Sequence, residues 1–120
     1  MKKLLFIALA TSLNAQAITG NELYVMLTAE IGTTESFQGL GYIQGFADNA
    51  GWSKFLEEDK AKAHNRKPNY FGLICAPEGS IVNQYIDIVK NYLKNKPEER
   101  HLSADGLALA ALTKAWPCPK

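Results

Sequence analysis

The chain has 120 residues, of which 47% are hydrophobic and 21% charged, and its formal net charge is +1 at pH 7. This length suits one small domain, and the balanced charge gives no reason to expect nucleic acid or an anionic membrane as a partner.

The N-terminus has the features of a secretory signal peptide. Met1-Lys2-Lys3 is basic, residues 4–10 are apolar, and Ala15-Gln16-Ala17 is a small-x-small cleavage site. The apolar run is too short for a transmembrane helix. We therefore expect a signal peptide at 1–17 and one soluble periplasmic domain at 18–120, with no membrane contact after cleavage. Loss of the two lysines leaves 11 Lys and Arg against 12 Asp and Glu, a formal charge of −1.

The first predicted helix begins directly after the cleavage site. Thr19 and Glu22 have the T-x-x-E spacing of a capping box. Apolar residues then recur at helical spacing, namely Leu23, Leu27 and Ile31. Gly32 is predicted to end this helix.

A second helix is predicted from Thr34, with apolar residues on one face: Phe37, Leu40, Ile43 and Ala47. Gly41 and Gly45 are four residues apart, so they leave a flat strip that another helix could approach closely. This strip predicts either packing within the chain or a contact with a partner or a second copy.

The helical pattern is lost between Asp48 and Asn69, where charges are frequent and Pro68 breaks any helix. We predict a long loop here, with residues 57–62 as a solvated helical turn or loop, serving either as a surface connection or as a partner contact. Trp52 is equally consistent with a core residue and with a binding anchor. The candidate partner-binding residues in this segment are Trp52, Glu57, Glu58 and Asp59.

Two further helices are predicted in the C-terminal half. Ser80 is a suitable N-cap for a helix with two adjacent apolar rows, which Pro97 ends. The last helix is predicted from Ser103 to just before Pro117. The fold class is therefore all-α, a small bundle of about four main helices.

Cys75 and Cys118 are the only cysteines of the chain. In an oxidising compartment such a pair is expected to form a disulfide, and two antiparallel helices would bring both residues to the same end of a hairpin. The bond would close a loop of about 44 residues and contribute about 4 kcal/mol to stability.

Catalytic chemistry is sparse in this sequence. His64 and His101 have no metal-ligand partner at helical spacing, and no nucleophile or phosphate-loop motif is present. Glu98 and Glu99 fit a solvated helix start better than an acid/base pair. We expect no catalytic residue, no metal and no cofactor, and interpret the protein as a non-enzyme.

Several short motifs occur in a characteristic order. They are Gly41-Tyr42-Ile43-Gln44-Gly45 with Asp48 following, Cys75-Ala76-Pro77 opening a helix, Pro97-Glu98, Arg100-His101, and Trp116-Pro117-Cys118. In this order the chain resembles the Rap/Tai family of immunity proteins associated with bacterial type VI secretion. The resemblance implies structural roles for Gly41, Tyr42, Gly45, Asp48, Pro77, Pro97, His101 and Pro117. Family members often carry another cysteine pair in the first two helices, which this chain lacks.

The resemblance implies an all-helical periplasmic protein, often dimeric, that binds a peptidoglycan-cleaving amidase effector and blocks its active site. The expected partners are thus a cognate amidase effector and a second copy of the chain. A different class, a small periplasmic acid-stress holdase chaperone, is also helical with one disulfide. Only two histidines titrate near neutral pH here, which gives that alternative little support.

Overall fold

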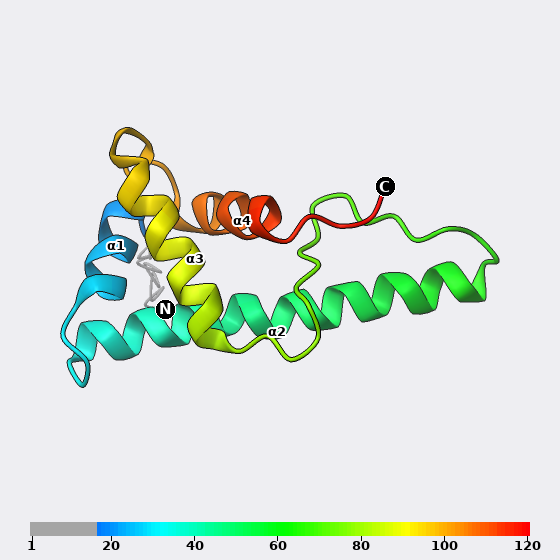
Figure 1. Ribbon diagram of the computed structural model, residues 1–120, viewed down its shortest axis with the longest axis horizontal. Coiled ribbons are helices and arrows are strands. Elements are labelled where there is room, and N and C mark those ends of the chain that lie inside the picture. Colours follow the sequence, from blue (N-terminus) through cyan, green and yellow to red (C-terminus); the bar gives the residue numbers. More distant parts are fainter. Residues whose placement is uncertain (1–16) are drawn as a thin grey trace, which may run out of the picture.

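The computed structural model describes residues 17–120 and contains four α-helices and one 3₁₀ helix. The predicted signal peptide lies almost entirely outside the described residues. Within residues 17–120 no strand forms, apart from one isolated bridge, so the predicted all-α class is confirmed. Helices α1 and α3 pack on the N-terminal half of a long helix α2, and α4 packs on α3 and α1 (Figure 1).

Helix α1 (Gly20–Thr28) has the predicted N-terminal cap. The backbone N–H of Thr19 donates to Glu22 Oε2 at 2.7 Å, and Glu22 N donates to Thr19 Oγ1 at 3.3 Å. The prediction that Ile31 belongs to this helix is wrong: its side chain is 98% exposed in the turn that follows. The next helix begins so soon that the chain must reverse here, and Gly32 provides the required positive φ of 94°.

Helix α2 (Thr34–Ala63) is 30 residues long and begins where predicted, with Thr33 as its N-cap. The predicted loop from residue 48 is wrong as far as Ala63, because the helix continues without interruption. Local pairs support this second half, including an i,i+4 ion pair of 3.8 Å from Lys54 Nζ to Glu58 Oε1. Ala50 and Ala61 are buried on its inner face.

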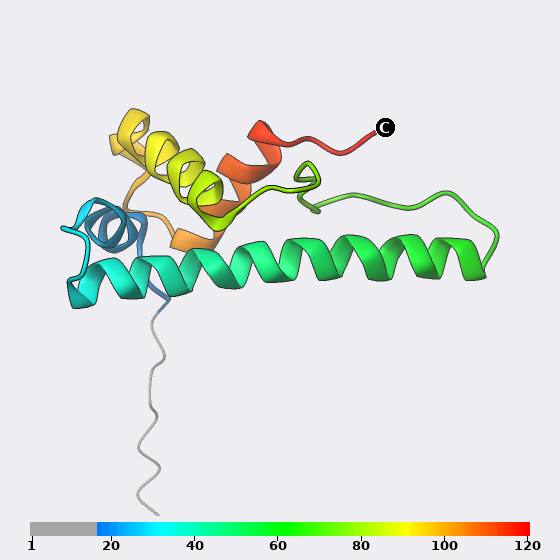
Figure 2. The same ribbon diagram turned by 60° about the horizontal axis from the view of Figure 1, so that its bottom comes forward.

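The chain reverses after α2 and runs back along it as an extended segment, residues 64–74, which we call the strap (Figure 2). Asn65 has a φ of 50° at this reversal. Pro68 lies within the strap, so the predicted helix break is present but comes after the helix has already ended.

Helix α3 (Val82–Asn95) begins one residue later than predicted. Its N-cap is Ile81, whose N–H donates to Gln84 Oε1 at 2.9 Å, whereas the hydroxyl of Ser80 donates to Pro77 O. Pro97 opens the short helix η1 (Pro97–Glu99), as its fixed φ and missing N–H favour.

Helix α4 (Ala104–Ala115) begins next to Ser103, near the predicted start, and Ser103 makes no side-chain capping bond. Cys75 and Cys118 form a disulfide with an S–S distance of 2.03 Å, which confirms the predicted bond. The hydrophobic core lies between these helices and the N-terminal half of α2. Its fully buried large side chains are Leu23, Ile43, Val89, Leu93 and Leu112.

Arg100 connects α1 and α3 beside this core. Its guanidinium lies 3.8 Å from the ring centroid of Tyr24, and its Nε donates to Leu93 O at 2.6 Å. Its carbonyl accepts the N–H of Asn21 at 2.8 Å. One side chain and its carbonyl thus fix the start of α1 against the end of α3.

Candidate functional site

The second half of α2 and the strap together form an arm, residues 48–74, that extends beyond the packed helices. Figure 2 shows α2 continuing past α1, α3 and α4 with only the strap lying along it. The strap is fixed to α2 by two side-chain clusters near the tip and to α4 by the disulfide. The arm is therefore a helical projection held in place at both ends of its return segment.

Glu57 makes the contacts at the tip of the arm. Arg66 Nη1 donates to Glu57 Oε1 at 2.7 Å, and Arg66 Nη2 donates to Glu57 Oε2 at 3.3 Å. The backbone N–H of Asn69 also donates to Glu57 Oε1, at 2.5 Å. The hydrogen bonds from Arg66 and then from Asn69 lower the pKa of the Glu57 carboxyl to about 2, so it remains ionised and binds the strap at ordinary pH.

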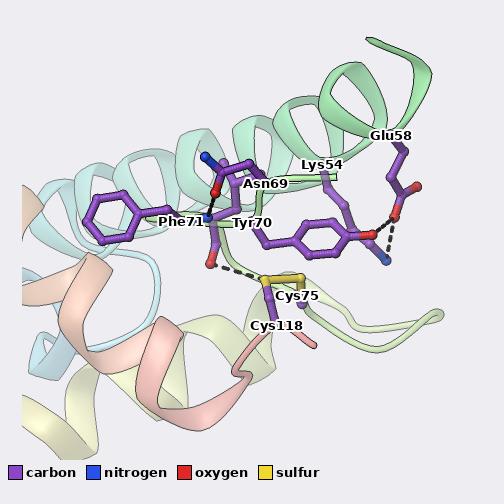
Figure 3. Close-up of a disulfide and its surroundings, with 8 residues drawn as sticks. Lys54, Glu58, Asn69, Tyr70, Phe71, Cys75 and Cys118 are labelled. Atoms are coloured by element: carbon purple, nitrogen blue, oxygen red, sulfur yellow. Dashed lines mark hydrogen bonds and ion pairs between the residues drawn. A yellow bond between two sulfur atoms is a disulfide. The ribbon is translucent and has the colours of Figure 1, made fainter. Parts of the chain in front are cut away.

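Glu58 fixes the next part of the strap. The hydroxyl of Tyr70 donates to Glu58 Oε1 at 2.9 Å, and Lys54 Nζ lies 3.8 Å from the same oxygen (Figure 3). This hydrogen bond raises the pKa of the Tyr70 hydroxyl. Two of the four predicted partner-binding residues, Glu57 and Glu58, thus bond to the strap of their own chain.

The base of the strap is held by the disulfide (Figure 3). Cys75 N donates to Trp116 O at 3.2 Å, and Cys118 Sγ lies 3.4 Å from Leu73 O. The ring of Trp116 contacts Tyr85 edge-on, with 4.7 Å between ring centroids. The C-terminal end of α4 therefore supports the arm through both backbone and side-chain contacts.

The outer face of the arm carries large apolar side chains that the chain itself does not cover. Trp52 is 62% exposed, Phe55 is 55% exposed, and their rings stack with centroids 5.5 Å apart. Leu56 is 48% exposed beside them. The interpretation of Trp52 as a core residue is thus wrong, because its ring lies on the surface.

Sequence reasoning missed Phe55, Leu56, Arg66 and Tyr70 at this site. A signal for the first two was present, because helical spacing puts one row of residues on a common face: Asp48, Trp52, Phe55, Leu56 and Asp59. Arg66 and Tyr70 have no comparable signal, because their partners depend on the path of the strap.

Of the two predicted uses of the glycine strip, packing within the chain is wrong. A Cβ at Gly41 or Gly45 would have no neighbour within 4 Å, so no helix of this chain packs there. The close approach is instead at Gly39, where a Cβ would lie 3.1 Å from Leu27 Cδ2 and from Met26 of α1. Tyr42, between the two exposed glycines, is half-buried and contacts Phe46, with 5.6 Å between ring centroids.

The acidic residues of the η1 turn stabilise that turn. Tyr92 OH donates to Glu99 Oε2 at 3.0 Å, and Lys96 Nζ donates to Glu99 Oε1 at 3.2 Å. Both hydrogen bonds lower the pKa of Glu99, and the bond from Tyr92 has the larger effect. Glu98 lies 3.8 Å from Lys96, and His101 is exposed.

The remaining motif residues lie at turns. Pro77 precedes α3, and its carbonyl accepts the N–H of Ser80 at 3.1 Å. Pro117 follows α4 and is exposed, as Pro77 is. Together with Trp116 and Cys118 it lies where the last residues meet the strap.

A cleft of about 640 Å³ lies between the strap and α4, beside the disulfide. Phe71, which is 94% exposed, and Leu109 contribute apolar surface to it. Among residues 17–120 no group of His, Cys, Asp and Glu is arranged to hold a metal ion. None of the helices in this range combines the length and apolar character needed to cross a bilayer.

These features define a small, disulfide-bonded, all-helical scaffold that presents a braced arm. The family model of the Rap1a immunity proteins matches residues 19–118, and the chain therefore belongs to the Rap1a immunity protein family. The match confirms the resemblance found in the sequence and covers all four helices and both cysteines. Membership in this family implies that the chain binds a cognate effector. Comparisons with curated proteins and with solved structures found no match.

Proposed function

We propose that this protein is a periplasmic immunity protein that binds a peptidoglycan amidase effector of type VI secretion and blocks its active site. In this role it protects the producing cell and its siblings, without catalysis of its own. Membership in the Rap1a family is the observation that carries the proposal. The N-terminal signal motif and the single disulfide support an oxidising, extracytoplasmic location.

The braced arm suits inhibition by occlusion. A protein inhibitor needs a preformed surface rather than reactive groups, because ordering a loose segment on binding costs affinity. Here the bonds from Glu57 and Glu58 to the strap, together with the disulfide, order the arm before any partner binds. A projection of this kind can fill or cover a cleft in an enzyme.

The test combines binding with enzyme inhibition. The oxidised mature protein, residues 18–120, is used to capture effectors from cells that produce type VI hydrolases, and each captured enzyme is assayed on purified peptidoglycan. We expect a single amidase to be bound stoichiometrically at neutral pH and its cleavage of peptide–glycan amide bonds to stop. Capture of many unrelated proteins at pH 3, with none at neutral pH, would support the chaperone instead.

A test in cells addresses location. An amidase effector exported to the periplasm should lyse cells that lack the immunity protein and spare cells that produce the full chain. A version without residues 1–17 should accumulate in the cytoplasm and fail to protect. Equal protection by both versions would contradict a periplasmic site of action.

A further inference from the structure

We propose that the outer face of α2, formed by Asp48, Trp52, Phe55, Leu56 and Asp59 and called here the outer stripe, is the surface that docks the cognate effector. The complementary site on the effector is an apolar pocket edged with lysine or arginine. This inference rests on the proposed function and adds to it the contact surface and its chemistry.

Helix geometry places the five residues together. Their spacing from Asp48 is four, seven, eight and eleven residues, which at 3.6 residues per turn keeps them on one face over three turns. The two buried residues in the second half of the same helix, Ala50 and Ala61, point to the opposite side, toward the core and the strap. The stripe therefore lies opposite the core, although Phe55 and Asp59 at its edge also border a hollow lined by Arg66 and Pro68 of the strap.

The middle of the stripe has the composition of a binding hot spot. Trp52, Phe55 and Leu56 are each about half exposed or more, and the two aromatic rings stack on each other. Tryptophan anchors that enter a partner's pocket commonly dominate interface energetics. Contiguous apolar surface with polar residues at its edge marks an interaction site on a soluble protein.

The two ends of the stripe are negatively charged. Asp48 and Asp59 lie one turn before Trp52 and one turn after Phe55, and both are exposed. Neither forms an ion pair with any residue of 17–120, and the stripe contains no lysine or arginine. A partner with cations around an apolar pocket would match both features.

The same charges disfavour a second copy as the occupant. If two stripes packed antiparallel with Trp52 of one beside Phe55 of the other, the acid at each end would face an acid of the other copy. Like charges facing each other across an interface weaken association. The charge pattern thus favours a different, basic protein.

The stripe is also held rigid from behind. Glu57 and Glu58 lie on the same three turns of α2 but bond to Arg66, Asn69 and Tyr70 of the strap. The acidic residues of this segment thus form two sets. Glu57 and Glu58 bond to the strap, whereas Asp48 and Asp59 are exposed and make no bond to it; Asp48 accepts a hydrogen bond from Gln44 Nε2 of its own helix. A braced helix loses little conformational entropy on docking.

The decisive experiment measures the affinity of the cognate effector for a variant with Trp52→Ala and Phe55→Ala. We expect the dissociation constant to rise more than about 30-fold, because both anchors are removed. The melting temperature should change little, since neither side chain belongs to the core. The matched control is Phe71→Ala, a more exposed aromatic residue on the strap, which should change affinity less than about threefold.

The outcomes separate the two proposals. If the wild-type protein binds and inhibits an amidase but the double variant binds equally well, the outer stripe is not the docking surface and the proposed function stands. If the wild-type protein binds no cell-wall hydrolase, both proposals fail. If Phe71→Ala lowers the affinity and the double variant does not, the effector contacts the strap, and the proposal that it docks on the outer stripe is wrong.

A second pair of substitutions tests the charge. Asp48→Asn with Asp59→Asn should slow association with the effector by about tenfold at low salt, and the difference should shrink at high salt. An association rate that is independent of these acids at every salt concentration would overturn the basic-edged pocket. Light scattering of the stripe variants provides the remaining check, because a changed oligomeric state with unchanged effector affinity would identify a second copy as the occupant.

Discussion

Gly20 and Gly41 are both helical glycines, but only Gly20 is enclosed by the rest of the chain. A Cβ at Gly20 would collide with the side chain of Leu107 and would lie 3.0 Å from Arg100 O. A Cβ at Gly41 would meet nothing within 4 Å. The two positions therefore call for opposite responses to the same substitution.

Gly20→Ala should lower the free energy of unfolding by about 1–3 kcal/mol, because the added methyl group overfills a packed junction. Gly41→Ala should raise it by about 0.5–1 kcal/mol, because alanine favours the helix. Urea denaturation of the oxidised mature protein measures both changes. Equal stability of the two variants would contradict the packing described here.

Glu57 makes the attachment of the strap dependent on pH. Its folded-state pKa of about 2 lies below the ordinary value of 4.5, so its contribution is complete above pH 4.5 and is lost as the pH falls toward 2. We expect the backbone amide of Asn69 to lose protection from hydrogen exchange over this interval. In Glu57→Gln the backbone amide of Asn69 should be less protected from exchange at pH 6 than in the wild type. Its remaining protection should change little between pH 4.5 and pH 2.

At the scale of elements, Arg100 joins α1, α3 and the turn before α4. Arg100→Ala should destabilise the protein by about 2–4 kcal/mol, since it removes a hydrogen bond of a charged group to Leu93 O and a cation–π contact with Tyr24. Arg100→Lys should recover only part of this loss, because lysine lacks the planar group that lies over the ring. A lysine variant as stable as the wild type would show that charge alone matters here.

The helix boundaries show which parts of the fold local chemistry encodes. The starts of α1 and α2 follow from the hydroxyls of Thr19 and Thr33, which accept hydrogen bonds from backbone N–H groups of the first turn. Ser103 is the N-cap of α4, but its side chain makes no capping hydrogen bond. Such short-range signals predicted three of the four helix starts, and the fourth differed by one residue.

The second half of α2 was not predictable in the same way. Its inner face is made of small residues, Ala50 and Ala61, whereas its large apolar residues face outward. A helix usually has its large apolar residues on the inner face, and here they are on the outer face. The sequence pattern of this segment therefore resembles that of an irregular loop. The strap allows this inversion, because its close approach needs small residues beneath it.

The site was predictable only in part. Residue type and segment identify Trp52 and Asp59 as candidates, and their contact with a partner is a prediction. The bonds from Glu57 and Glu58 to residues nine and twelve positions further on depend on the three-dimensional return of the chain. Sequence spacing alone carries no sign of such contacts.

At the scale of the whole molecule, the disulfide joins two regions that are 43 residues apart in the sequence. Replacing both Cys75 and Cys118 with serine should lower the free energy of unfolding by about 4 kcal/mol, chiefly because the unfolded chain gains freedom. Thermal unfolding of the variant and of the oxidised wild type measures this loss. The reduced wild-type protein should melt with the variant, and an unchanged melting temperature in both would show that the bond contributes nothing.

The pairing of the first described residues with the turn before α4 has a consequence for the order of folding. Ala104 N donates to Ile18 O at 2.9 Å, and Gly20 N donates to Leu102 O at 2.9 Å, so the start of α1 is bonded to the start of the last helix. Helix α1 alone is too short to persist in water. A growing chain therefore cannot complete its core until its last helix has been synthesised. Such a chain would stay open throughout synthesis, the state in which a polypeptide can be threaded through a narrow channel.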